Sequence, residues 1–232
     1  MSLWLLTVAM YPEARMLTAR LDLSEEIGRR PCWRGTLVGR EVILVLTGIG
    51  AVNAAQATTS ALAAEPGIEA VINLGCAGAC EGSGLGLGKV ALATEVVLAD
   101  MGVQSAQGLV GLDEVDIALA GRSSGRPLYN RIPCDPGLNE LIRRANPGIA
   151  EGPFATVGRI SGDAPTAQAM ARRWGAIMEE MEGAAVGQVA RWYAKPFAAI
   201  RGVSNPAGRR ELDVATGAEA AQRALLALGD SW

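Results

Sequence analysis

Short apolar runs alternate with segments of helical periodicity along the whole chain, and this alternation constrains the fold more than any other feature. The run at residues 3–9 has the length of one buried strand. Pro12 and Glu13 follow it, a pair typical of the first turn of a helix. The same order recurs to the C-terminus without an internal repeat or linker. The pattern predicts an α/β fold with a central sheet, in one domain over residues 1–232.

The boundaries of the predicted elements follow from periodicity and from helix-capping residues. Strands are predicted at residues 3–9, 41–47, 70–74, 89–98, 156–160 and 197–203. Helices are predicted from Pro12 onward and at residues 53–64, 135–145, 164–174, 182–193 and 215–228. Residues 102–134 are rich in Gly, Ser, Asp and Pro and show little periodicity. Such a long irregular segment often forms a functional loop or a subunit contact.

The chain contains no histidine. This excludes a Ser-His-Asp triad, a Cys-His dyad, a His-ligated zinc and an imidazole base. Acid–base chemistry must therefore come from carboxylates, Lys, Tyr, Cys or bound water. Cys32, Cys76, Cys80 and Cys134 have no C-x-x-C spacing and are typical of reduced, partly buried residues of a cytosolic protein. We expect no metal site.

The charge and hydropathy patterns argue against two classes of partner. The formal net charge of −3 gives no electrostatic reason to expect nucleic acid or an anionic membrane surface. The N-terminus lacks a basic region, and no apolar run approaches the ~18 residues of a membrane span. We therefore expect a cytoplasmic protein that binds a small molecule.

Glycine-rich turns follow two of the predicted strands. Gly48 and Gly50 invite a dinucleotide interpretation, but Asn53 stands where the third glycine of G-x-G-x-x-G would be. Residues 82–88 complete neither that motif nor a Walker motif. We expect no nicotinamide cofactor, and no cofactor of another kind.

Three further segments lie where a sheet of this class binds ligands. Residues 73–79 end a predicted strand, and their small side chains would let backbone N–H groups approach a ligand. A packed turn explains that stretch equally well. Glu182 begins a helix of small residues, beside Glu179 and Glu180, and one of these carboxylates is expected to face a site. Residues 201–206 end the last strand, where a plain turn is the simpler interpretation.

Six segments occur together in a fixed order: A-M-Y-P-E (9–13), T-G-I-G (47–50), N-L-G-C-A-G (73–78), S-G-D-A (161–164), M-E-G-A-A (181–185) and R-G-V-S-N (201–205). This set resembles the nucleoside phosphorylase and nucleosidase superfamily. The resemblance implies a three-layer α/β/α sandwich with a central mixed, partly closed sheet. It also implies a homo-oligomer, a dimer or higher, in which a neighbouring subunit lines part of the site.

The resemblance assigns roles at matching positions. Glu13 corresponds to the carboxylate that activates the attacking water, and Glu182 to the one that holds the ribose hydroxyls, with Met181 packed against the sugar. Asn205 falls where many members carry an Asp that acts at purine N7. Further substrate contacts are expected from Cys76, Ala77, Gly78, Thr166 and Ser204. Pro165 and Thr166 stand where adenosine-cleaving relatives place an aromatic and an aliphatic residue on the base.

The nature of the nucleophile follows from two residues. Members that use phosphate carry an arginine just before the glycine-rich turn of the third strand, where this chain has Asn73-Leu74-Gly75. Glu13 would repel a phosphate dianion in a partly desolvated pocket. We therefore expect a pocket without a cationic group for phosphate near Glu13, and hydrolysis of an N-glycosidic bond.

The expected base is hypoxanthine. An Asn at 205 cannot supply a proton to adenine N7, but it can hydrogen-bond a 6-oxopurine. The segment 181–205 is most similar to futalosine hydrolases, which act in a menaquinone pathway. The alternatives are a methylthioadenosine/S-adenosylhomocysteine nucleosidase, a purine nucleoside phosphorylase and a non-catalytic nucleoside-binding protein.

Overall fold

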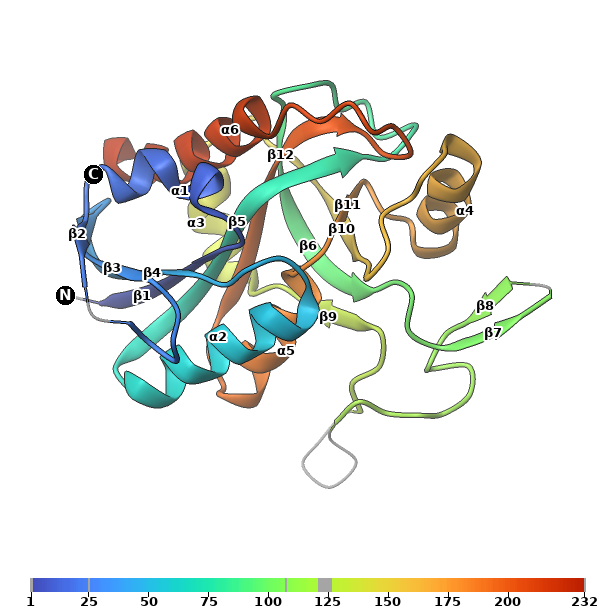
Figure 1. The fold of residues 1–232 in the computed structure, drawn as a ribbon, viewed down its shortest axis with the longest axis horizontal. Coiled ribbons are helices and arrows are strands. Elements are labelled where there is room, and N and C mark those ends of the chain that lie inside the picture. The colour runs from blue at the N-terminus through green and yellow to red at the C-terminus, as the bar shows by residue number, and fades with distance from the viewer. Residues whose placement is uncertain (1, 25, 107, 121–126, 232) are drawn as a thin grey trace.

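A large mixed sheet organises the chain in the computed structural model, which describes residues 2–24, 26–106, 108–120 and 127–231 (Figure 1). The strands are β1 (Leu3–Val8), β2 (Asp22–Leu23), β3 (Cys32–Leu37), β4 (Arg40–Leu46), β5 (Ile68–Ala79), β6 (Val90–Leu98), β7 (Val103–Ser105), β8 (Gly108–Val110), β9 (Arg131–Pro133), β10 (Ala150–Thr156), β11 (Met178–Glu180) and β12 (Phe197–Pro206). The helices are α1 (Tyr11–Thr18), α2 (Ala51–Ala64), α3 (Pro136–Ala145), α4 (Ala164–Trp174), α5 (Gly183–Trp192), α6 (Val214–Leu226) and the 3₁₀ helix η1 (Ala227–Ser231).

The sheet is partly closed. Its strand order is β11-β10-β6-β12-β5-β1-β4-β3-β2, with β9 beside β6. β1 and β12 both pair parallel with β5, whereas β12 and β6 are antiparallel. β11 returns to pair antiparallel with β5, so that β5, β12, β6, β10 and β11 form a barrel-like ring. The α/β fold with a mixed, partly closed sheet, expected from the resemblance, is confirmed.

Helices cover both faces of this sheet (Figure 1). One apolar cluster packs α1, α3 and α6 against it, through residues such as Leu17, Ile142 and Leu225. A second cluster packs the small residues of α2 and α5 against the opposite face. No helix in the described part of the chain has the length and apolar character needed to cross a bilayer.

The structure corrects the predicted strand at residues 156–160. The strand β10 ends at Thr156, and residues 150–153, for which the sequence predicts no element, form its first half. Pro153 had obscured this strand in the sequence, because proline cannot donate to a ladder. The register between β10 and β6 shifts at this point, between Gly152 and Phe154, which accommodates the proline.

Other strands lie where the sequence predicted none. The sequence predicts no strand at β2, β3 or β11, and β7, β8 and β9 lie within the segment expected to be irregular. β5 continues through residues 75–79 to Ala79 instead of stopping at Leu74. This extension carries residues 75–78 past the edge of β1, into the region where the site forms.

Candidate active site

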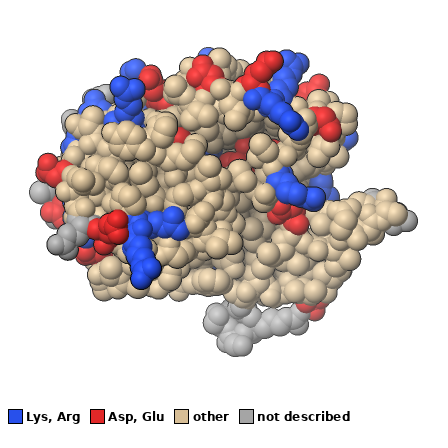
Figure 2. Space-filling model, in the orientation of Figure 1, with Lys and Arg blue, Asp and Glu red and all other residues tan. Residues whose placement is uncertain are grey.

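A cavity of about 260 Å³ lies where the ends of β5, β11 and β12 meet the loop before α1. It is lined by Ala9, Met10, Glu13, Ile49, Cys76, Ala77, Gly78, Ile160, Ser161, Glu179, Glu180, Met181, Glu182, Ser204, Asn205, Gly208, Arg209, Leu212 and Val214. The face drawn in Figure 2 carries charges of both signs and a hollow with acidic atoms inside it. The described lining thus combines the buried carboxylates of Glu13, Glu179, Glu180 and Glu182 with exposed apolar side chains such as Ile49, Ile160 and Leu212.

Glu13 is fixed by two backbone donors. It lies in the first turn of α1 and is only 4% exposed. Its Oε2 accepts a hydrogen bond from the Met10 N–H at 3.2 Å, and its Oε1 accepts one from the Cys76 N–H at 2.8 Å. Because each oxygen has a backbone partner, the carboxylate is held in one orientation and retains lone pairs for a further donor.

Gly75 provides the space in which Glu13 and Arg201 converge. A Cβ placed on Gly75 would lie 2.7 Å from Glu13 Oε1 and 2.8 Å from Arg201 Nη1. Only glycine lets the backbone of β5 approach both charged groups this closely.

We therefore predict that Gly75→Ala displaces Glu13 or Arg201 and lowers turnover strongly. Both neighbouring atoms belong to side chains held by several hydrogen bonds, so neither can retreat without losing partners. Gly67→Ala is the matched control, because nothing lies within 4 Å of its added Cβ. The two variants are compared by their steady-state rates of hydrolysis of the nucleoside N-glycosidic bond expected from the sequence. Equal turnover in both would show that the close approach at Gly75 is unimportant.

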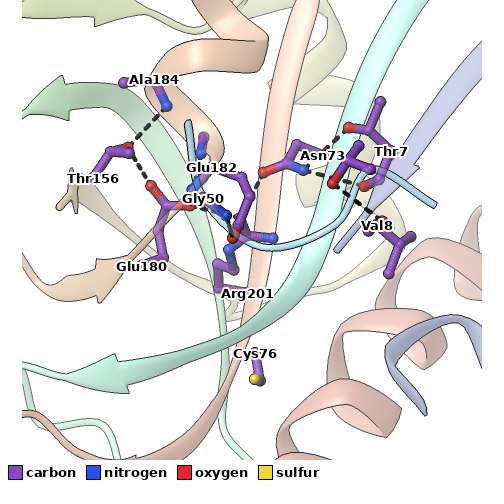
Figure 3. Close-up of polar contacts among 12 residues, drawn as sticks. Thr7, Val8, Gly50, Asn73, Cys76, Thr156, Glu180, Glu182, Ala184 and Arg201 are labelled. Atoms are coloured by element: carbon purple, nitrogen blue, oxygen red, sulfur yellow. Dashed lines mark hydrogen bonds and ion pairs between the residues drawn. The ribbon is translucent and has the colours of Figure 1, made fainter. Parts of the chain in front are cut away.

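Arg201 is buried in β12 and links three groups (Figure 3). Its Nη2 donates to Asn73 Oδ1 at 2.6 Å and to Glu180 Oε2 at 2.6 Å, and lies 3.3 Å from Glu182 Oε2. Asn73 is itself held by donating to the backbone carbonyl and the hydroxyl of Thr7. A buried guanidinium is tolerable only with such partners, since desolvation of an unpaired charge is costly.

Glu182 stands at the N-cap of α5 and accepts a hydrogen bond from the Gly50 N–H at 2.9 Å. Burial raises the pKa of its carboxyl to about 7, the positive charge of Arg201 opposes this rise, and the negative charge of Glu180 adds to it. Glu182 therefore titrates near neutral pH.

This titration predicts how stability depends on pH. The pKa of Glu182 is about 7 in the folded chain, against an ordinary value of 4.5, so in this window the folded chain holds a proton that the unfolded chain releases. The contribution to stability is complete below pH 4.5 and is lost as the pH rises through about 7. Glu182→Gln cannot ionise and should lack this component. Urea denaturation of both proteins across the window would show it, and parallel pH profiles would contradict it.

Two side chains of the cavity lining have little capacity left for a ligand: the thiol of Cys76 is unreactive, and the amide of Asn205 is largely hydrogen-bonded within the protein. Burial raises the pKa of the Cys76 thiol to about 12, and the charge of Glu13 adds to this, so the thiol stays protonated and is a poor nucleophile. The Asn205 Nδ2 donates to the carbonyls of Pro206 and Arg209, at 2.9 and 3.0 Å. Its Oδ1 accepts from the Ser204 hydroxyl at 2.7 Å. One lone pair of that oxygen remains for a donor in the cavity.

The structure brings most of the predicted site residues together. The ones that line the one cavity are Glu13, Cys76, Ala77, Gly78, Met181, Glu182, Ser204 and Asn205. Thr166 lies apart from them: it is exposed in the first turn of α4, and its backbone N–H is bound by the capping carboxylate of Asp163. The residues after Ser161 thus begin a helix instead of covering the cavity.

Sequence reasoning gave no specific role to three buried charged residues, beyond the expectation that one carboxylate of the cluster at 179–182 faces a site. Glu180 and Arg201 form an ion pair of 2.6 Å, and Glu179 accepts from both the backbone and the hydroxyl of Ser161. A signal for the pair was present, since Arg201 interrupts an apolar strand and a buried arginine demands a carboxylate. The sequence does not reveal which glutamate of the cluster at 179–182 is that partner.

Comparison with known proteins yields a consistent set of relatives. The family described as the phosphorylase superfamily matches residues 5–229. The futalosine hydrolase of Thermus thermophilus is 41% identical over 180 residues, covering 77% of this chain and 75% of that protein. The 5′-methylthioadenosine/S-adenosylhomocysteine nucleosidase of Bacillus thuringiensis is 33% identical over 215 residues, covering 87% and 84%. The crystal structure of such a nucleosidase from Neisseria meningitidis, in complex with methylthio-immucillin-A, superposes with a TM-score of 0.82 at 27% identity and covers 100% of both chains.

Proposed function

We propose that this chain, a hydrolase of nucleoside N-glycosidic bonds that belongs to the phosphorylase superfamily, cleaves futalosine and releases hypoxanthine. The observation that carries the reaction type is the Glu13 carboxylate, oriented by two backbone N–H groups in the same cavity as Glu182. The 41% identity to a futalosine hydrolase supports the choice of substrate.

In the proposed reaction Glu13 takes a proton from a water molecule as that water attacks the ribosyl carbon. The bond from this carbon to the purine nitrogen breaks, and its electron pair leaves with the base. Positive charge develops on the sugar in the transition state, and the carboxylate of Glu182, bound to the ribose hydroxyls, stabilises it. Met181 packs against the sugar. No step requires histidine, in agreement with its absence.

The charged groups around Glu13 favour water over phosphate as the nucleophile, although one of them is a cation. The expectation of a pocket without a cation near Glu13 needs correction, because Arg201 Nη1 approaches the same point above Gly75. However, Nη2 of this guanidinium is bound by Glu180, Glu182 and Asn73. A phosphate dianion there would meet the carboxylates of Glu13 and Glu180, and that of Glu182 in its ionised form, and their repulsion is only weakly screened in a buried site.

The direct test is to incubate the protein with futalosine, inosine and methylthioadenosine, with and without phosphate, and to separate the released bases by chromatography. Hypoxanthine from futalosine in phosphate-free buffer supports the proposal. Faster release of adenine from methylthioadenosine would favour the second candidate, a methylthioadenosine/S-adenosylhomocysteine nucleosidase. The relative from Bacillus thuringiensis and the Neisseria meningitidis structure favour that candidate. A strict requirement for phosphate would indicate a phosphorylase, and no product at all a binding protein.

The proposed preference for a 6-oxopurine predicts the effect of Asn205→Asp. An Asp at this position can carry a proton to purine N7, which an amide cannot, so the variant should favour 6-amino purines. We expect the ratio of kcat/KM for methylthioadenosine to that for futalosine to rise by roughly 10–100-fold, part of the ~10²–10⁴-fold typical of acid–base catalysis. Gln104→Glu, which makes the same change from amide to carboxylate at an exposed position of β7 outside the cavity, is the control. An unchanged ratio would mean that the base is recognised elsewhere.

The proposal includes a homo-oligomer whose neighbouring subunit completes the site. Val52 on α2 is 85% exposed and Trp192 on α5 is 58% exposed. These two helices pack against each other, and large exposed apolar side chains of this kind often mark a contact surface. Sedimentation velocity measures the oligomeric state directly. A monomer at the concentrations used in the activity assay would exclude this part of the proposal.

A further inference from the structure

The Glu180 carboxylate binds more groups than pairing with one guanidinium requires. Its side chain is only 1% exposed. Besides Arg201 Nη2, its Oε2 accepts the backbone N–H of Glu182 at 2.9 Å and that of Gly183 at 2.7 Å. Its Oε1 accepts from the hydroxyl of Thr156. Glu180 thus contacts the amino end of α5 directly (Figure 3).

Thr156 supplies an acceptor for the next backbone N–H of the helix, that of Ala184. Its hydroxyl donates to Glu180, and its oxygen accepts the backbone N–H of Ala184 at 2.8 Å. The first N–H groups of a helix have no carbonyl partner within it and need an acceptor from outside. Glu180 and Thr156 together bind three successive N–H groups, those of Glu182, Gly183 and Ala184.

The residue at an N-cap usually accepts such an N–H with its own side chain. Glu182 occupies the N-cap of α5 but makes no capping bond. Its carboxylate instead turns away from the helix, toward the Gly50 N–H at 2.9 Å and the Arg201 Nη2 at 3.3 Å. It can do so because the acceptors that the helix needs come from Glu180 and Thr156.

We propose that Glu180, supported by Thr156, is a positioning residue that caps α5 in place of Glu182 and so leaves the Glu182 carboxylate free to bind the ribose hydroxyls. This inference rests on the role of Glu182 in the proposed function. It differs from a purely electrostatic role for Glu180 as counter-ion of Arg201. If charge were its only contribution, removing the uncharged hydroxyl of Thr156 would leave Glu182 undisturbed.

The test is a double-mutant cycle. Thr156→Val removes the hydroxyl and keeps the side-chain shape, Thr156→Ser is its matched control, and Glu180→Gln removes the charge. Each is made in the wild-type and Glu182→Ala backgrounds, and KM and kcat for futalosine are measured. We expect Thr156→Val and Glu180→Gln to lower kcat/KM by roughly 10–100-fold, as for a lost hydrogen bond to a charged group, because Glu182 both binds the ribose and stabilises its developing charge. Thr156→Ser should resemble wild type. In the Glu182→Ala background both effects should nearly vanish. Equal effects in both backgrounds would overturn the inference.

A second measurement is independent of activity. In crystals of Thr156→Val the Ala184 N–H loses its acceptor, and we expect the Glu182 side chain to turn back onto that N–H and to leave Gly50. A carboxylate still bound to the Gly50 N–H in this variant would overturn the inference, whatever the assay shows. If wild-type protein releases no base from any nucleoside, the proposed function fails, and the crystal structures still decide the capping role.

Discussion

Replacing Glu13 with Gln should lower kcat by about 10²–10⁴-fold, the range typical of a lost general base, while nucleoside affinity changes little. The amide has nearly the shape of the carboxylate but cannot accept the proton of the attacking water. It also presents an N–H₂ group to one of the two backbone donors, Met10 N–H or Cys76 N–H, so one local hydrogen bond is lost. Turnover measures the first effect and calorimetric titration the affinity.

Two variants make this result specific. Glu13→Asp retains the charge but withdraws it by one methylene, and it should also lose turnover if position matters. Glu69→Gln, an exposed glutamate on β5, changes the same kind of group outside the cavity and should have no effect. Near-normal turnover of Glu13→Gln would remove Glu13 from the mechanism.

The largest effect on stability is expected for Arg201→Met. This substitution leaves the buried carboxylates of Glu180 and Glu182 without their guanidinium, and breaking a buried ion pair on one side typically costs about 3–5 kcal/mol. For a chain of this size, this loss corresponds to a decrease of roughly 6–20 °C in Tm. The decrease should be smaller in acid, where the carboxylates can take up protons. Calorimetry at two pH values measures both effects.

Arg191→Met on the exposed end of α5 is the matched control and should leave Tm nearly unchanged. Arg201→Lys separates charge from geometry. Lysine keeps the positive charge but cannot reproduce the planar fork that reaches Asn73 and Glu180 together. A Tm of Arg201→Met equal to that of wild type would mean that the ion pair contributes nothing to the folded state.

Elements whose ends are set by local chemistry could be predicted from the sequence. The helix predicted at residues 164–174 matches α4, because Asp163 caps its start and Gly175, in the left-handed conformation with φ 68°, ends it. The helix after Asp135 begins as predicted for the same reason: the Asp135 carboxylate accepts the Leu138 N–H. In both cases the determining contacts span only a few residues.

Elements that depend on distant partners could not be predicted in this way. β11 consists of Met178, Glu179 and Glu180, a composition with no strand signal, and it forms only because β10 and β5 both pair with it. The same distinction between local and distant contacts applies to the residues of the candidate site. Glu13 and Glu182 stood in recognisable segments, whereas the network of Arg201 joins residues more than a hundred positions apart, such as Asn73.

The return of β11 to β5 has a consequence for motion within the site. Glu179, Gly78 and Asn205 lie on adjacent strands, since Gly78 is paired with Glu179 on one side and with Asn205 on the other. In an open sheet an outer strand could slide or fray alone, but in a closed hydrogen-bonded circuit a shift of one strand must be matched by its neighbours. The strand walls of the cavity therefore resist independent displacement, and any widening of the cavity must come from lining residues outside the strands, such as Ile49, Ile160 and Arg209.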